Sequence, residues 1–303
     1  MPSFLKLRII VTTLSVLFIC SYTVSAQALI NIVTAENFYG EVAKEIGGPY
    51  VNVVSILNNP NQDPHLFTTS SSTAIALLKA NIIIYNGIDY DPWMQTLLSN
   101  QKNSHIIVVA DLMNVKNGGN PHIWYMPETI PTYAIKLVDT LNQIDPAHRE
   151  YFQKQLNNFN QSYQPIFEKI KNLKQHFNNT SVIATEPVFN YMVEAIGLKM
   201  HGEGFQLSMM NDVPPTFSQV KQFEDDLRQH SVRIVIFNNQ VINPSIKHML
   251  SIAENEKIPA VGVSEIMPIN LTYVQWILQE LNLLENTLVL EKMRETHHDS
   301  IRE

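Results

Sequence analysis

Short apolar runs alternate along the chain with segments in which apolar residues recur every three or four positions. In the first half the runs lie at residues 30–34, 51–57, 81–85 and 106–109. They are almost continuously apolar, which is typical of strands buried on both faces of a parallel sheet. The intervening segments with a helical pattern are 36–46, 70–80 and 91–99. Ser70 is suited to cap the second of these helices. This alternation predicts an α/β fold.

One long amphipathic helix is predicted from Asp145 to residue 178. Asp145 and Pro146 are typical of a helix start. Beyond them, apolar residues follow in alternating steps of four and three, which places them on one stripe of a helix. The stripe comprises Phe152, Leu156, Phe159, Tyr163, Ile166, Ile170, Leu173 and Phe177. Pro165 is expected to kink it. We interpret it as a rigid connection between two halves, the alternative being a surface helix of one domain.

The α/β alternation resumes after this helix. Strands are predicted at 182–185, 234–237 and 260–263, and helices at 188–196, 217–229, 244–256 and 273–290. Gly197 fits the end of the first helix. The predicted fold is α/β, with two lobes that each hold a parallel-type sheet flanked by helices, joined by one long rigid helix. The predicted boundaries are residues 27–144 for the N-terminal lobe, 145–178 for the connecting helix, 179–290 for the C-terminal lobe and 291–303 for a frayed tail.

The first 26 residues have the pattern of an export signal. Lys6 and Arg8 precede a 12-residue apolar run, and small residues follow at Val24, Ser25 and Ala26. A membrane anchor is disfavoured because a bilayer core needs about 20 apolar residues. Lipid attachment at Cys20 is the other alternative, and the bulky Ile19 before it disfavours this. We therefore expect a cleaved signal peptide, 1–26, and a periplasmic location.

Composition narrows the possible functions. The 303 residues are 45% hydrophobic and 16% charged, and the net charge is −7. That balance argues against a nucleic-acid partner, which would require an excess of basic residues. Residues 27–303 contain no cysteine. Any metal site in this part of the chain must therefore use His, Asp or Glu ligands.

Two histidines occur in similar loops after predicted strands. His65 lies in NPNQDPHLF and His122 in GGNPHIWYMP, and a proline precedes each. Ligands of open α/β sheets bind outside the carboxyl ends of the strands, where these loops lie. Proline restricts the backbone just before each imidazole. The two loops together favour a shared metal site.

The second half places two carboxylates in equivalent positions. Glu186 follows the strand at 182–185, and Glu265 follows the strand at 260–263. Each could instead complement the dipole of a following helix. Two imidazoles and two carboxylates would suit manganese, zinc or ferrous iron. We expect them to converge across a cleft between the lobes.

Several phrases resemble one known family. They are DPHLF, NPHIWYMP, ATEPVFNYMVEAIGL, IFNNQV and GVSEIMPINLTYVQW. Their order and spacing are similar to those of the solute-binding proteins of bacterial zinc and manganese ABC transporters, the TroA/ZnuA-like family. The resemblance implies two α/β lobes joined by a long helix, with one divalent ion between them. It implies that His65, His122, Glu186 and Glu265 are the metal ligands.

The sequence departs from that family in ways that bear on the metal. Many zinc-specific members have His and Asp in place of Glu186 and Glu265, and many carry a long His-rich loop where residues 111–120 are short. These differences favour manganese or iron modestly, because zinc binds such ligands at least as tightly. Asn238, Asn239 and Gln240 stand where other members have an acidic residue. We interpret these amides as groups that orient Glu186 or Glu265.

The predicted function is a periplasmic carrier. It would capture one divalent ion (Mn²⁺ or Zn²⁺, with Fe²⁺ as a further option) and deliver it to an ABC permease, as a monomer without catalytic residues or a resident cofactor. A secreted metalloenzyme is the main alternative, but four protein ligands leave no position for water and no hydrolase motif is found. A metal-dependent adhesin on the same fold is a third hypothesis. Trp124 and Tyr125 either wall the cleft or pack in the core.

Overall fold

The computed structural model describes residues 28–61, 64–99 and 104–302. The side chains of His65, Glu295 and residues 297–302 are outside that description. The predicted signal peptide and Cys20 also lie outside the described residues. Within the described residues, no helix combines the length and apolar character needed to span a membrane.

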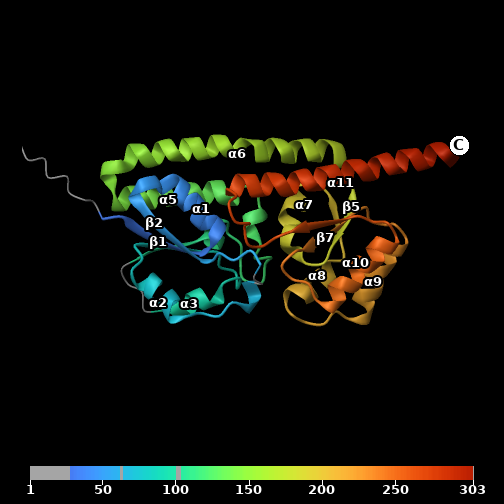
Figure 1. Cartoon of the computed structure of the whole chain (residues 1–303), viewed down its shortest axis with the longest axis horizontal. Helices are drawn as coiled ribbons and strands as arrows, with labels where there is room; N and C mark the ends of the chain where they lie inside the picture. Colours follow the sequence, from blue (N-terminus) through green and yellow to red (C-terminus); the bar gives the residue numbers. More distant parts are fainter. Residues whose placement is uncertain (1–27, 62–63, 100–103, 303) are drawn as a thin grey trace, which may run out of the picture.

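The N-terminal lobe is a parallel sheet covered by helices on both faces (Figure 1). Its strand order is β2-β1-β3-β4, and every pairing is parallel. The elements are β1 (Ile30–Glu36), α1 (Asn37–Gly47), η1 (Gly48–Tyr50), β2 (Val51–Leu57), η2 (Pro64–Leu66), α2 (Ser71–Leu78), β3 (Ile82–Tyr85), α3 (Pro92–Leu98), β4 (His105–Val108), α4 (Val109–Leu112), η3 (Ile123–Tyr125), α5 (Thr129–Ile144) and η4 (Pro146–His148).

The C-terminal lobe repeats this architecture. Its strand order is β6-β5-β7-β8, again with parallel pairings. After α6 (Arg149–Phe177), the elements are β5 (Ser181–Ala184), η5 (Pro187–Phe189), α7 (Asn190–Ile196), β6 (Lys199–His201), α8 (Glu203–Met210), α9 (Phe217–Arg228), β7 (Val235–Asn238), α10 (Pro244–Asn255), β8 (Ala260–Val263) and α11 (Tyr273–Arg302). The predicted fold class, two α/β lobes joined by a long helix, is confirmed.

The connecting helix α6 runs along both lobes, beside α11 (Figure 1). All eight residues of the predicted apolar stripe are buried, and Pro165 lies inside the helix. The stripe packs toward α5 and α1 in one lobe and α7 in the other. Burying one side of a 29-residue helix against helices of both lobes explains why this weakly apolar segment is helical throughout.

Local signals were confirmed at two helix ends. The Ser70 side chain accepts a hydrogen bond from the backbone N–H of Thr73 at 3.2 Å, and so caps α2. Gly197 ends α7 in the left-handed conformation, with φ of 79°.

Two features differ from the expectations. β2 and β4 are edge strands with partly exposed side chains, not strands buried on both faces. Residues 291–302 continue α11, where a separate frayed tail was expected. In addition, α5, α8 and β6 were not predicted. β6 has only three residues and exists through its pairing with β5, so its own sequence carries little strand signal.

Aromatic side chains join the two lobes at their interface. Phe38 of α1 packs against Trp124 and against Trp276 of α11, with ring centroids 5.0 and 5.8 Å apart. Tyr125 contacts both Trp276 and Phe189. Trp124 and Tyr125 are fully buried. They are therefore core residues at the lobe interface.

A buried carboxyl, Glu280 of α11, ties this aromatic cluster to the loop after β8. Its Oε1 accepts hydrogen bonds from the Trp276 indole at 2.9 Å and from the Ser264 N–H at 3.1 Å. Its Oε2 lies 2.7 Å from the Tyr125 hydroxyl, which also donates to the Ser264 carbonyl at 2.6 Å. Burial raises the pKa of Glu280 to about 7. The Tyr125 phenol has one proton and can donate to only one of these two oxygens at a time. If Glu280 is protonated, its Oε2–H donates to the Tyr125 oxygen, and the phenol donates to the Ser264 carbonyl.

We therefore expect Glu280→Gln to be tolerated and Glu280→Ala to cost about 1–3 kcal/mol of unfolding free energy, because alanine leaves buried donors unpaired.

The folded Glu280 carboxyl keeps its proton up to about pH 7, whereas an unfolded carboxyl loses it near 4.5. Its stabilising contribution is therefore complete below about pH 4.5 and is lost as the pH rises to about 7. Urea unfolding at several pH values should show Glu280→Gln gaining on the wild type as the pH rises. A constant difference would contradict the raised pKa.

Candidate metal site

Strand ends from both lobes meet at the lobe interface. The strands of each sheet are parallel, so all their carboxyl ends lie on one edge. Hydrogen bonds cross directly between these edges. Asn37, just after β1, donates to the Met267 carbonyl at 2.7 Å, and Gln240, just after β7, donates to the Pro60 carbonyl at 2.6 Å. Three of the four predicted ligands lie at this interface with described side chains.

His122 is buried and its ring is fixed from one side. Its Nδ1 lies 2.6 Å from the Asn120 Oδ1. The other end of the Asn120 amide donates to the Pro187 carbonyl at 2.7 Å, which identifies the end facing His122 as oxygen. An amide oxygen only accepts, so His122 Nδ1 carries a proton and Nε2 of the neutral ring has the lone pair. Nε2 has no hydrogen-bond partner among the described residues. In this tautomer the lone pair of Nε2 is available to a metal.

Glu186 and Glu265 converge on a single amide. Asn238, the last residue of β7, donates through Nδ2 to Glu186 Oε2 at 2.8 Å and to Glu265 Oε1 at 2.5 Å. Glu265 Oε2 lies 3.6 Å from His122 Nε2. Glu265 is 0% exposed and Glu186 is 6% exposed. Two carboxylates in a buried site are costly unless a cation compensates their charge. The local chemistry therefore suits a divalent metal.

Two of the three amide residues at the end of β7 contact the predicted glutamate ligands as expected, and the third does not. Asn238 bridges both glutamates, and Gln240 Oε1 accepts the backbone N–H of Glu265 at 2.6 Å and that of Ile266 at 2.9 Å. Asn239 instead lies against Gly262 of β8, where a Cβ atom would be 2.1 Å from its Oδ1. A larger residue at position 262 would force the Asn239 side chain to move. The prediction for Asn238 and Gln240 is borne out by these hydrogen bonds, and Asn239 supports the sheet.

His65 lies in η2, in the loop after β2, and its side chain is outside the described set. Its role as a ligand therefore stays a prediction. Among the described side chains, no group of three or more His, Asp or Glu is assembled as a metal cluster. The amide of Asn238 lies between the two carboxylates in this arrangement.

Sequence reasoning missed the supports of His122. Asn120, two residues before it, orients the ring, and the Tyr191 hydroxyl donates to the Asn120 carbonyl at 2.9 Å. The phrase GGNPH contained the signal, because an Asn two positions before a ligand can reach its backbone and ring.

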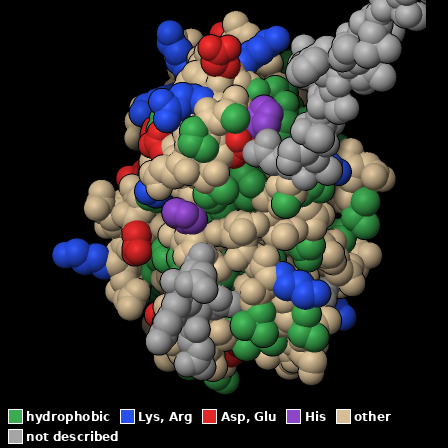
Figure 2. Space-filling model, turned by 90° about the vertical axis from the view of Figure 1, so that its left-hand side faces the viewer, with side chains coloured by type: hydrophobic (Ala, Val, Ile, Leu, Met, Phe, Trp, Pro, Cys, Tyr) green, Lys and Arg blue, Asp and Glu red, His purple; other side chains and the backbone are tan. Residues whose placement is uncertain are grey.

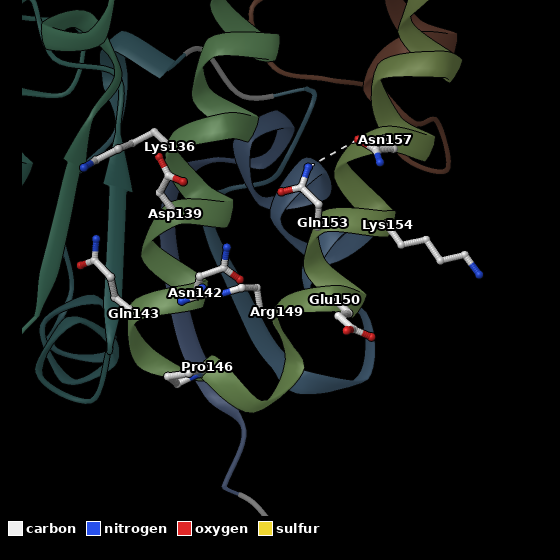
Figure 3. Close-up of a pocket in the computed structure, with 10 residues that line it drawn as sticks. All are labelled: Lys136, Asp139, Asn142, Gln143, Pro146, Arg149, Glu150, Gln153, Lys154 and Asn157. Atoms are coloured by element: carbon white, nitrogen blue, oxygen red, sulfur yellow. Dashed lines mark hydrogen bonds between the residues drawn. The ribbon is translucent and has the colours of Figure 1, made fainter.

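A groove also lies elsewhere on the molecule. It has a volume of about 980 Å³ and runs between α5 and the start of α6 (Figure 3). Its lining is a mixture of amides and opposite charges, such as Asp139 and Arg149. On the face drawn in Figure 2, basic and acidic side chains are likewise interspersed. Neither the groove nor this face has the single sign of charge that would indicate a binding site for a second, charged ligand.

Comparisons with known proteins identify the family of the chain. Residues 32–287 match the family described as the periplasmic zinc-uptake complex component A, and the chain belongs to this family. The manganese ABC transporter substrate-binding lipoprotein PsaA of Streptococcus anginosus is 23% identical over 255 residues, which are 78% of this chain and 79% of the relative. The manganese-binding lipoprotein MntA of Bacillus subtilis (strain 168) is 23% identical over 246 residues, 77% and 78% of the two chains.

Solved structures show the same fold. The periplasmic zinc-binding protein TroA of Treponema pallidum superposes with a TM-score of 0.74 at 15% identity, covering 86% of this chain and 99% of that one. The Cd-bound periplasmic metal-binding protein of Candidatus Liberibacter asiaticus gives a TM-score of 0.68 at 18% identity, covering 85% and 99%. The predicted family resemblance is confirmed.

Proposed function

We propose that this protein captures one divalent transition-metal ion between its lobes and delivers it to an ABC permease for uptake. The observation that carries the proposal is the convergence of His122, Glu186 and Glu265 from facing strand ends. His65 completes the proposed ligand set from the loop after β2. Membership of a metal-uptake family supports the same role.

The proposed ion is manganese or zinc, with ferrous iron as a third option. Relatives are named for both manganese and zinc. A ligand set of imidazole and carboxylate accepts all three ions, and intrinsic affinity favours zinc over manganese. We infer that metal supply outside the cell decides between them.

The role proposed is binding, not catalysis. Four protein ligands would fill a tetrahedral site, whereas a catalytic centre usually keeps one position for water. The proposed partners are the metal ion and the permease, with the chain acting as a monomer.

Export is part of the proposal. Segment 1–26 would direct the chain out of the cytoplasm, either as a cleaved signal or with lipid attached at Cys20. Two relatives are named lipoproteins. The comparisons therefore do not support our expectation that lipid anchoring is the less favoured of these two routes.

Metal titration of the full chain, stripped with a chelator, tests the function. We expect calorimetry at about pH 7.5 to give one site per chain for Zn²⁺ and for Mn²⁺, and weaker binding at about pH 5, because protons compete for the imidazole and carboxylate ligands. Absence of a one-to-one site for Zn²⁺, for Mn²⁺ and, in an anaerobic titration, for Fe²⁺ would refute the proposal. Affinity that is unchanged at pH 5 would contradict the proposed ligands.

A further inference from the structure

The loop between β3 and α3, residues 86–91, has an unusual backbone. Gly87, Ile88 and Asp89 follow one another in the left-handed region, with φ of 83°, 51° and 58°. That conformation is unfavourable for a β-branched residue, and Ile88 is also buried. Such strain persists only where the surroundings hold it, and it is concentrated at functional sites. We therefore asked what holds this loop and what it contacts.

Asp91 holds the two ends of the loop together. Its carboxylate accepts the backbone N–H of Asn86 at 2.7 Å and that of Gly87 at 2.9 Å. Burial raises the pKa of Asp91 to about 6, so it remains ionised at neutral pH. Glu36, at the end of β1, is also buried, and burial together with the charge of Asp91 raises its pKa well above the usual range. Glu36 is thus the protonated member of this pair, and Asp91 is the anionic anchor.

Asn86 reaches from this loop to the backbone before His122. Its Nδ2 donates to the Pro121 carbonyl at 2.8 Å, while its Oδ1 accepts the Tyr39 hydroxyl at 2.8 Å. Both ends of the amide are therefore used, and the Tyr39 bond fixes which end faces Pro121. Asn86 is fully buried. It fixes the peptide before His122, and Asn120 holds the imidazole itself.

Tyr90 reaches from the same loop to the opposite lobe's ligand. Its ring packs edge-on against Trp124, with centroids 4.8 Å apart, and lies 6.0 Å from the His122 ring. The Tyr90 hydroxyl lies beside the Glu265 carboxylate. A phenol has one O–H donor and a carboxylate only accepts, so Tyr90 is placed to donate to Glu265.

We propose that the Asn86–Asp91 loop positions two metal ligands at once, His122 through the bond of Asn86 to the Pro121 carbonyl and Glu265 through the adjacent Tyr90 phenol. Asn86 and Tyr90 are positioning residues in this scheme, and Asp91 keeps the strained loop closed. The inference rests on the proposed metal site. It adds two residues from one loop that set how firmly, and in which orientation, ligands of both lobes are held.

Two variants test this role, each measured against the wild type with Zn²⁺ and Mn²⁺. We expect Asn86→Ala to weaken binding about 10–100-fold and Tyr90→Phe about 10-fold, as is usual for groups that orient ligands. The Mn²⁺ EPR spectrum of Tyr90→Phe should also change, since the symmetry around the ion depends on how Glu265 is held. Tyr85→Phe is the matched control, because Tyr85 is similarly buried but packs in a separate cluster on the other face of the sheet.

The outcomes separate this inference from the proposed function. Wild-type affinity and an unchanged EPR spectrum in Tyr90→Phe would overturn the inference, while one-to-one binding by the wild type would leave the proposed function standing. Failure of the wild type to bind either ion would overturn both. If Asn86→Ala does not fold, Tyr90→Phe decides, because it removes one oxygen and retains the ring.

Discussion

Replacing His122 by alanine should lower the affinity for Zn²⁺ by at least about 100-fold. Outer residues that merely orient ligands typically contribute 10–100-fold, and loss of a ligand itself should cost more. The ring is 1% exposed and its Nδ1 is held by Asn120, so Nε2 points at the Glu265 carboxylate in a prepared position. Competition with a chelating dye would measure the loss.

His105→Ala is the control for that experiment. His105 is exposed at the first residue of β4, at the edge of the sheet opposite to the strand ends that form the site. Its replacement should leave metal affinity unchanged. Equal affinities for His122→Ala and His105→Ala would exclude His122 as a ligand. Circular dichroism of both variants would verify that the fold is intact.

Trp276→Ala should have the largest effect on stability, a loss of about 3–5 kcal/mol of unfolding free energy, as is typical when a buried aromatic ring is removed. The side chain is 1% exposed and contacts Phe38 of the other lobe and Tyr125, with centroids 5.8 and 5.6 Å away. Its indole also donates to Glu280. The variant therefore leaves a cavity at the lobe interface and removes one donor from a buried carboxyl.

Leu283→Ala, on the same helix, provides the comparison. Leu283 is 47% exposed, so its truncation should change stability by less than about 1 kcal/mol. Denaturant unfolding of both variants gives the two values. Similar losses would mean that the aromatic contacts across the interface contribute little.

The sequence predicted most elements because their signals were local. The stripe of α6 repeats over eight residues, and β8 is an unbroken apolar run. The signal for α5 was present but was not used: Ile130, Ala134, Leu137 and Leu141 are spaced as on one helical face, and all are buried. The exposure of β2 and β4 could not be predicted, because it depends on which strands occupy the sheet edges.

The site was predictable only in part. His122, Glu186 and Glu265 each follow a strand, and the rule for parallel sheets places such residues together. Asn86 and Tyr90 gave no comparable signal. Their positions depend on three consecutive left-handed residues and on the bonds of Asp91 to the loop backbone, neither of which follows from residue type. Asn86-Gly87 predicts a turn but not what the turn contacts.

The packing of the connecting helix has a consequence for how the molecule folds. Its apolar stripe belongs to one continuous cluster that includes Ile32 and Phe38 of the first lobe, and Val182 and Trp276 of the second. On the side that faces α6, neither sheet therefore has a complete core of its own. Opening one lobe would expose apolar surface of the other lobe to water. We therefore expect the two halves, although they are architectural repeats, to unfold together as one cooperative unit. An ion bound between them would raise the melting temperature of the entire chain.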